Sequence, residues 1–416
     1  IYLLAVALAG TLLTSCSDFL DKVPLVVPSS ETFLTNQSAV TNYVDGLYIA
    51  LPSAGAYGMG IMGEEKNSDN MVAMVYDRRM NGELQESIGG VTEWQKGYQN
   101  LRSVNYFLEY YKVPAAEETA EVLSLKGEAY FFRAYWHYYL LTKFGSIPVM
   151  DKFWDGNATV GELQIPARDR SAVAQFILDD LKAAKELLYS RSKYQGLRIC
   201  KEAAMVMAMR VALFEGTWEK YHKGTDFAAA EYKSDDFLQQ VLTLGDELFQ
   251  MGITLNTKEN DKSVKNIDDA YGNLFNSKDL SATQEVLFWK KYSIADNLVH
   301  SLNTNLSSGM CDAEGPAGLS QSLVDNYLSV DGNFIDPTAA KFKDFNESFK
   351  DRDGRLLATV MHSDCKYKSM TVKGAKKMLV KAYSEEDKDL INPPQIVSTG
   401  NQSNTTCLLY TSDAAD

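Results

Sequence analysis

Aromatic residues in stretches without a helical period are the first candidates for binding chemistry in this sequence. A flat aromatic ring can lie against the apolar C–H face of a sugar, while neighbouring polar groups hydrogen-bond the sugar hydroxyls. The segment 64–80 is the first choice, because it combines Tyr, Asn, Asp and Arg in a loop-like region. The alternative for each residue is a role in local packing. The candidate ligand contacts are Tyr57, Asn67, Asp69, Asn70, Tyr76, Arg78, Trp154, Trp289 and Tyr292.

The residue types used in acid–base catalysis do not form a convincing constellation. His137 is one of four histidines and lies inside the most apolar stretch, where a hydrogen-bonded core residue is expected. Arg133, in the same stretch, is expected to pair with a buried carboxylate. Glu64 and Glu65 are adjacent, so they point in different directions in a helix or a strand. The sequence predicts no catalytic residue, and we expect a protein that is not an enzyme.

Metal and phosphate sites also lack support in the sequence. His362 and Cys365 are the nearest approach to a metal-ligand pair, but a structural zinc site needs four ligands. Residues 351–354 begin like a calcium loop, although the third acidic position and the closing glutamate are absent. The glycine-rich run 55–63 has no strand before it, which favours a loop over a phosphate cradle. We therefore predict no metal and no cofactor.

The cysteine at position 16 follows a short apolar run. Residues 1–13 are nearly all apolar, too few to span a bilayer but typical of the apolar part of a signal peptide. Leu13-Thr14-Ser15-Cys16 resembles the bacterial lipobox, in which small residues let a peptidase reach the bond before a cysteine that carries lipid. An ordinary signal peptide with a coincidental cysteine, or a buried helix, is the alternative. We expect Cys16 to be lipidated, because two or more acyl chains give stable anchoring.

The bulk composition narrows the class of partner. A chain of 416 residues is too long for one compact core and suggests one large or two to three ordinary domains. The hydrophobic content of 45% and charged content of 23% are typical of globular proteins. The net charge of −14, with no cluster of Lys and Arg to offset it, argues against nucleic acid as a partner.

The elements that must position these residues are mainly helical. Apolar residues recur at helical spacing in six stretches, and two of these are apolar nearly all round, which indicates burial. Charged residues within 125–145 would be too costly in lipid for a membrane span. Past Gly252 polar loops dominate, with one short strand predicted at 283–293. The predicted helices cover 37–50, 92–108, 125–145, 171–190, 200–219 and 234–251.

Several stretches together resemble one known family, the SusD/RagB family of outer-membrane nutrient-binding lipoproteins. The most telling is GEAYFFRAYWHYYLLTKFGSIPVM (127–150), which is close to the family's Arg-Ala-Tyr, Phe-Gly and Pro-Val pattern. DRDGRLLATV looks like the family's Asp-Pro-Arg stretch, with Gly354 in place of proline. The order and spacing of the segments carry the resemblance. They are CSDFLDKVP at Cys16, WQKGYQNLRSVNYFLE (94–109), residues 127–150, ARDRSAVAQFILDDLKAA (167–184), AAMVMAMRVALFEGTW (203–218), LVDNYLSVDG (323–332) and DRDGRLLATV (351–360).

This resemblance implies a mainly α fold of tetratricopeptide-like helical hairpins, with a loop-rich portion that carries a few short strands. It also implies a surface-exposed outer-membrane lipoprotein, facing the exterior, that binds oligosaccharides or polysaccharide. Such a protein delivers its ligand to a partner SusC-like TonB-dependent transporter. The alternative is the capture of peptides, as in the RagB branch, and the outsider is a surface glycoside hydrolase.

The resemblance also gives the expected domain organisation. We expect a signal peptide over 1–15, a lipidated tether over 16–30, a helical region over 31–252 and a loop-rich region over 253–406. The family usually continues further, so the loop-rich region is expected to be truncated, as is the start of the signal peptide. The last residues, 407–416, resemble translated adaptor sequence and are expected to be non-native.

Overall fold

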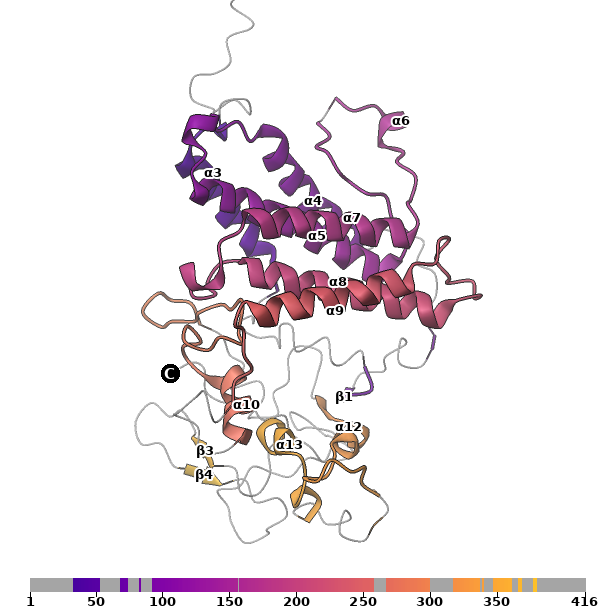
Figure 1. Ribbon diagram of the computed structural model, residues 1–416, viewed down its shortest axis with the longest axis vertical. Helices are drawn as coiled ribbons and strands as arrows, with labels where there is room; N and C mark the ends of the chain where they lie inside the picture. Colours follow the sequence, from indigo (N-terminus) through magenta and orange to yellow (C-terminus); the bar gives the residue numbers. More distant parts are fainter. Residues whose placement is uncertain are drawn as a thin grey trace, which may run out of the picture. The chain divides into compact units, whose positions relative to one another are not determined.

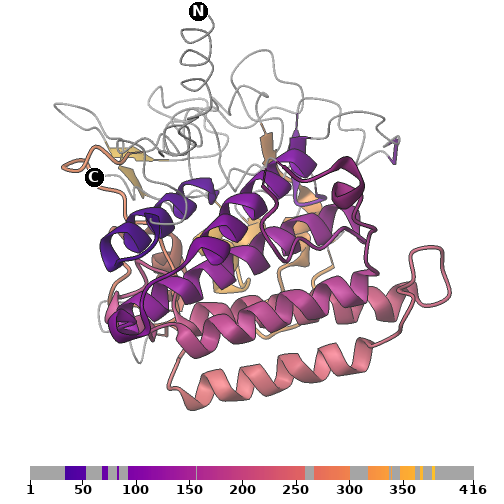
Figure 2. The same cartoon turned by 90° about the horizontal axis from the view of Figure 1, so that it is seen from above.

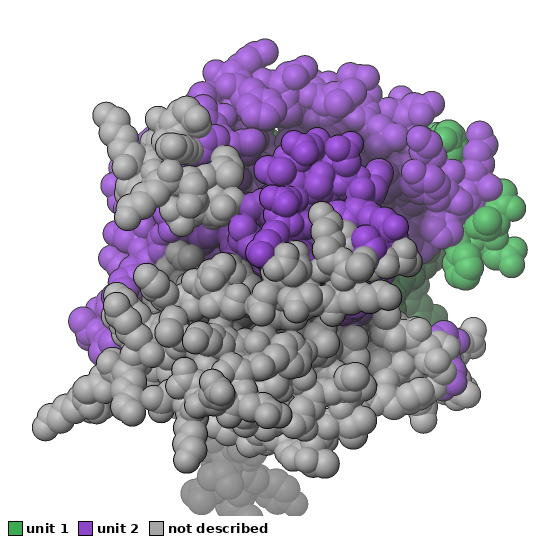
Figure 3. All heavy atoms as spheres, turned by 90° about the horizontal axis from the view of Figure 1, so that it is seen from below, with its two compact units in different colours: residues 1–49, 93–188, 224–232 green, residues 50–92, 189–223, 233–416 purple. Residues whose placement is uncertain are grey.

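The computed structural model shows a mainly helical chain made of two compact units. It describes residues 33–52, 68–73, 82–83, 92–155, 157–257, 267–299, 317–336, 339, 347–360, 366–368 and 377–379. Unit 1 comprises residues 1–49, 93–188 and 224–232, and unit 2 comprises residues 50–92, 189–223 and 233–416 (Figure 3). The predicted boundary between a helical region (31–252) and a loop-rich region (253–406) stays a prediction, because these two units are defined by contacts within the chain and do not test it.

Unit 1 contains most of the long helices with clear sequence signals. Polar side chains begin four helices of this unit: Asn36 accepts the Ala39 N–H at 3.0 Å, and Thr119, Thr159 and Asp169 act in the same way. Gly145 ends a helix with φ of +71°, a backbone region that glycine enters without strain. Among the described residues, the helices of unit 1 are α3 (Gln37–Leu47), α4 (Thr92–Tyr110, in unit 1 from Glu93), α5 (Ala120–Phe144), α6 (Val160–Leu163) and α7 (Arg170–Leu187), with the 3-10 turns η2 (Tyr48–Ala50, whose last residue belongs to unit 2) and η4 (Ala115–Glu117).

Helix α5 is the centre of unit 1. It packs against α7 and α3, and α5 and α7 lie side by side in Figure 1. Trp136, Phe132 and Leu140 are almost fully buried, which explains why its sequence is apolar on nearly every side. A Cβ on Gly97 of α4 would lie 2.5 Å from Leu140 Cδ2, so the absence of a side chain there permits the close approach of α4 and α5.

Unit 2 contains the pair α8 (Lys201–His222) and α9 (Ser234–Gln250), which run side by side along their length (Figures 1 and 2). Gly216 makes room for Leu238 at the contact, and the Ser234 hydroxyl donates to the Gly216 carbonyl at 2.7 Å. The other helical elements of unit 2 are short. They are η5 (Arg191–Lys193), α10 (Ile267–Asn276), α12 (Gln321–Asn326), η7 (Glu347–Phe349) and α13 (Gly354–Thr359).

Two short antiparallel strand pairs lie in the described part of unit 2. Strand β1 (Met71–Ala73) pairs with β2 (Ala317–Leu319), and β3 (Lys366–Lys368) pairs with β4 (Lys377–Leu379). Met71 and Leu319 belong to a small core shared with α12, η7 and α13. Segments about 250 residues apart in sequence are thereby joined.

The predicted strand at 283–293 is wrong. The chain there is irregular, and Ser293 makes only a single bridge, to Leu298. The Arg191 guanidinium holds this stretch through the carbonyls of Leu280, Thr283 and Val286, at 2.7–3.0 Å. Backbone carbonyls of this stretch therefore bond to the Arg191 side chain instead of to a neighbouring strand.

The six predicted helices are confirmed within a few residues, α5 beginning five residues before its predicted start at 125. Among the described residues, no helix combines the length and the apolar character that a membrane crossing requires.

Candidate functional site

A cavity of about 270 Å³ lies in unit 1, between the C-terminal end of α4 and the segment that leads to α6. Its lining is part aromatic and part polar. Trp154, one of the predicted ligand contacts, is among the lining residues, so we call this cavity the Trp154 pocket. The lining residues are Glu109, Tyr110, Lys152, Phe153, Trp154, Asp155, Asn157, Ala158 and Glu162.

Phe153 packs the segment between α5 and α6 against α4. Its ring meets Tyr106 edge-on at 5.3 Å and Tyr110 at 5.7 Å between centroids. The guanidinium of Arg102 lies over the Phe153 ring at 4.6 Å and also donates to the Trp154 carbonyl. Because the Phe153 ring and the Trp154 carbonyl both contact residues of α4, this helix sets the position of Trp154.

Trp154 is half-buried and has an unsatisfied hydrogen-bond donor. Its indole Nε1 is buried and meets no acceptor among the residues that the structure describes. A buried donor without a partner costs about 1–3 kcal/mol, so a ligand oxygen placed there would recover stability. The Lys152 ammonium lies 4.1 Å from the ring centroid, so one face of the indole is already covered.

The polar rim of the pocket is fixed by local hydrogen bonds. Asp155 Oδ1 accepts the Asn157 backbone N–H at 2.9 Å, and Asp155 Oδ2 accepts from Asn157 Nδ2 at 3.3 Å. Thr159 and Glu162 form a reciprocal capping box at the start of α6, in which Glu162 Oε2 accepts the Thr159 backbone N–H at 2.9 Å. Hydrogen bonds from the Thr159 backbone and hydroxyl lower the pKa of Glu162, so its carboxylate is ionised near neutral pH.

The arrangement is suited to holding a polyhydroxylated molecule. Aromatic rings offer apolar surface, the indole N–H can donate, and ionised carboxylates can accept hydrogen bonds from hydroxyls. A volume of about 270 Å³ is slightly below the range of pockets that enclose a drug-sized ligand, and would accommodate a small part of a longer chain.

Two other predicted aromatic contacts lie in unit 2, and neither lines this pocket. Trp289 is 9% exposed, and its indole N–H donates to the Gln195 carbonyl at 2.9 Å. The same ring lies against Gly196, whose φ of +81° favours glycine. Trp289 thus has a packing role, which was the alternative for each candidate. Tyr292 is half-buried, with the Lys290 ammonium 5.2 Å from its ring.

Asp69 and Asn70 lie directly before β1 in unit 2. The Asp69 carbonyl accepts from the Ser320 hydroxyl, and the Asn70 carbonyl accepts the Ser320 N–H at 2.8 Å. The backbone of this predicted contact region is therefore tied to the residue after β2. Tyr57, Asn67, Tyr76 and Arg78, and the predicted lipidation site Cys16, lie outside the described residues.

The two polar residues expected in the core of the central helix are confirmed. Arg133 makes a two-pronged ion pair with Asp180 of α7, at 2.8 and 2.7 Å. Burial raises the pKa of Asp180, an effect that hydrogen bonds from Arg133 oppose. His137 is fully buried, accepts the Met150 N–H at Nε2 (3.1 Å) and therefore donates from Nδ1 to the Arg133 carbonyl (2.9 Å). Burial lowers the pKa of His137 to about 3.

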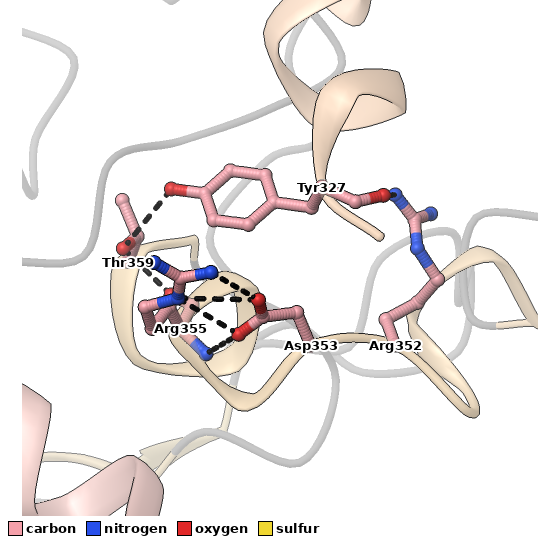
Figure 4. Close-up of polar contacts among 5 residues, drawn as sticks. All are labelled: Tyr327, Arg352, Asp353, Arg355 and Thr359. Carbon is pink, nitrogen blue, oxygen red and sulfur yellow. Dashed lines mark hydrogen bonds and ion pairs between the residues drawn. The ribbon is translucent and has the colours of Figure 1, made fainter. Parts of the chain in front are cut away.

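The stretch 351–354, which begins like a calcium loop, has a structural role in unit 2. Arg352 is 4% exposed and donates to the carbonyls of Val324 and Tyr327, which fixes the end of α12 (Figure 4). Asp353 begins α13 and pairs with Arg355 at 2.5 Å. The Tyr327 hydroxyl points to Thr359 at 3.5 Å across this cluster.

Most of the pocket was not identified from the sequence. Glu109 and Tyr110 lie at the end of a helix, and Tyr110 is 42 residues before Lys152. No local sequence pattern predicts that they line a pocket with the segment that begins at Lys152. Among the lining residues that the sequence analysis missed, Glu162 is the one with a local sequence pattern, because Thr159-x-x-Glu162 has the spacing of a capping box.

Comparisons with known proteins agree with this fold. A family model described as "Starch-binding associating with outer membrane" matches residues 18–213, and a model of the SusD family matches residues 276–412. A SusD-like protein of Formosa agariphila is 23% identical over 223 residues, which are 49% of this chain and 41% of that protein. The chain thus spans less than half the length of that curated relative.

Solved structures show the same architecture. A SusD-like carbohydrate-binding protein from Bacteroides fragilis superposes with a TM-score of 0.67 at 18% identity, over 91% of this chain and 68% of that one. A second SusD-like protein from the same species gives 0.65 at 21% identity, over 94% and 71%. These likenesses confirm the expected mainly α, SusD-like fold. With two SusD models matching successive parts of its sequence, the chain belongs to the SusD/RagB family.

Proposed function

We propose that the protein is a surface-exposed outer-membrane lipoprotein that binds oligosaccharide or polysaccharide chains and delivers them to a partner SusC-like, TonB-dependent transporter. The observation that carries the binding step is the Trp154 pocket. There a half-buried indole with an unpartnered N–H lies among carboxylate and amide groups. These are the two kinds of group that a sugar engages, through its C–H face and its hydroxyls.

The location and the partner rest on different support. Family membership, and the family model's own description of a protein associating with the outer membrane, favour this location. The lipobox-like sequence at Cys16 supplies the anchor in this proposal. Delivery to a transporter comes from the family resemblance.

Binding without cleavage is favoured by the state of the Glu162 carboxylate. Hydrolysis of a glycosidic bond requires one carboxylic acid that stays protonated until it reaches the leaving group. The pKa of Glu162 is instead lowered by its hydrogen bonds with Thr159, and that carboxylate already serves the cap of α6. Glu162 is therefore better suited to accepting hydrogen bonds than to donating a proton.

Calorimetric titration of the purified protein against a panel of polysaccharides and of peptides tests the proposal. We expect at least one polysaccharide to bind, and Trp154→Ala to weaken that binding about tenfold or more through lost contact area. Tyr221→Ala is the matched control, because Tyr221 is 75% exposed and lies outside the pocket. Circular dichroism checks that both variants fold.

Two outcomes would contradict the proposal. Binding of peptides with no binding of polysaccharides would favour the RagB-like alternative. Polysaccharide binding that Trp154→Ala leaves unchanged would remove this pocket as the site.

A further inference from the structure

We infer that the Trp154 pocket selects uncharged sugar units and rejects units that carry carboxylate or sulfate groups. This inference rests on the proposed function, because it names the class of glycan that the same site would take. It is drawn from the charges and hydrogen-bonding capacities of the rim.

The rim carries more negative than positive charge. Glu109, Asp155 and Glu162 contribute three carboxylates, against the single ammonium of Lys152, so the described lining has a net formal charge of −2. The Lys152 ammonium lies on the Trp154 ring, 4.1 Å from its centroid. The nearby Arg102 guanidinium lies on the Phe153 ring and donates to the Trp154 carbonyl, and Arg102 is not among the lining residues.

The hydrogen-bonding groups lead to the same conclusion. Ionised carboxylates only accept hydrogen bonds, and a sugar hydroxyl can donate to them, whereas a ligand carboxylate or sulfate cannot. Asn157 Nδ2 donates one of its two N–H groups to Asp155 Oδ2 at 3.3 Å. Trp154 Nε1, which has no acceptor among the described residues, is a neutral N–H suited to a hydroxyl or ring oxygen.

The expected size of the discrimination follows from Coulomb's law. An anionic group a few ångströms from a net charge of this size, at a surface with an effective dielectric constant between those of water and protein, loses about tenfold in affinity per charge. The pocket is open to solvent on its rim, so added salt should reduce this loss.

A matched pair of ligands tests the inference. The neutral polysaccharide that binds best is treated so that a fraction of its primary hydroxyls becomes carboxylates, which leaves the backbone otherwise unchanged. We expect the oxidised form to bind about tenfold more weakly than its parent at low salt, and the difference to shrink in 0.5 M NaCl. Equal binding, or tighter binding of the oxidised form, would overturn the inference. If no polysaccharide of the panel binds at all, the proposed function itself fails.

Charge-neutral variants test which carboxylates cause the difference in affinity between the two ligands. Glu162→Gln keeps the capping box, because glutamine occupies the same position in such boxes. Combined with Glu109→Gln, it should narrow the gap between the two ligands at least threefold. Glu117→Gln is the control, since this exposed carboxylate lies on η4, outside the lining. An unchanged gap in the double variant would show that these carboxylates are not its source.

A measurement without any glycan keeps the inference testable. Iodide and caesium quench indole fluorescence and carry opposite charges, so their efficiencies report the local potential. The Trp154 signal is taken as wild type minus Trp154→Phe, and the quenching by each ion is divided by its quenching of free N-acetyltryptophanamide. On this normalised scale caesium should quench Trp154 more than iodide does. The double variant Glu109→Gln, Glu162→Gln should reverse or abolish that preference. A normalised quenching that is stronger for iodide in the wild type would contradict a negatively charged rim.

Discussion

At the scale of single residues, His137 shows how burial fixes a protonation state. The ring is fully buried, and both nitrogens have backbone partners that suit only the neutral form with hydrogen on Nδ1. Protonation would leave two N–H groups facing one carbonyl and one N–H donor. Burial therefore lowers the pKa of His137 to about 3, against about 6.5 in an unfolded chain.

This difference predicts a loss of stability in mild acid. Between pH 6.5 and 3 the unfolded chain binds a proton at His137 that the folded protein does not, so the free energy of unfolding falls as the pH falls. From pH 7 to pH 5 the contribution is about 2 kcal/mol. Urea unfolding of wild type and His137→Gln at both pH values should show a smaller decrease in the variant by that amount. Parallel decreases would contradict the assignment, and the difference between the two proteins should stay constant from pH 7 to 8.

At the scale of elements, long periodic helices were predictable and the pieces between them were not. Six helices follow from the spacing of apolar residues, because each buries one face or all of its surface. The strand predicted at 283–293 failed because strand-forming residues need a partner strand, and here Trp289 donates its backbone N–H to Gly196 in an irregular segment. Short helices such as α10 and α13 depend on packing against each other, and no local sequence pattern predicts such packing.

The candidate site follows the same division. Trp154 could be singled out because a tryptophan outside any helical period suggests exposure. Its neighbours Glu109 and Tyr110 could not, because they come from the end of a different helix. Arg133 shows the same difference between what a local sequence pattern predicts and what depends on the packing of distant helices. A buried partner for Arg133 was expected from burial alone, yet its identity as Asp180, 47 residues away, depends on how α5 and α7 pack.

Two helical glycines give a prediction at this scale. Alanine at Gly97 would place Cβ 2.5 Å from Leu140 Cδ2 and 2.6 Å from its Cγ, which forces α4 and α5 apart. Overpacking of this kind costs about 1–3 kcal/mol, more than the gain of up to about 1 kcal/mol from better helix propensity. Gly97→Ala should therefore lower the midpoint of urea unfolding.

Gly46→Ala is the matched change, because Gly46 lies in α3 with nothing within 4 Å of an added Cβ. There the propensity gain stands alone, and stability should rise by up to about 1 kcal/mol. Opposite shifts of the two midpoints support a tight α4–α5 contact. If both variants are stabilised, the contact is looser than described.

At the scale of the whole molecule, the proposed function assigns attachment and ligand binding to different segments of the sequence. The match to the outer-membrane family model begins at residue 18, directly after the lipobox-like stretch. The Trp154 pocket, in contrast, is formed wholly by residues 109–162 of unit 1. If these two functions are independent, losing the anchor should leave ligand affinity intact.

Cys16→Ala tests this separation in cells. Without the thiol there is no lipid attachment, so the protein should move from the membrane fraction to the soluble fraction. Its affinity for the bound polysaccharide, measured after purification, should stay within twofold of wild type. Cys200→Ala is the matched control, since this buried thiol lies at the start of α8 and its loss should leave the protein with the membranes. A Cys16→Ala protein that still fractionates with membranes would show that another segment anchors the chain, and a loss of affinity would show that anchor and pocket are coupled.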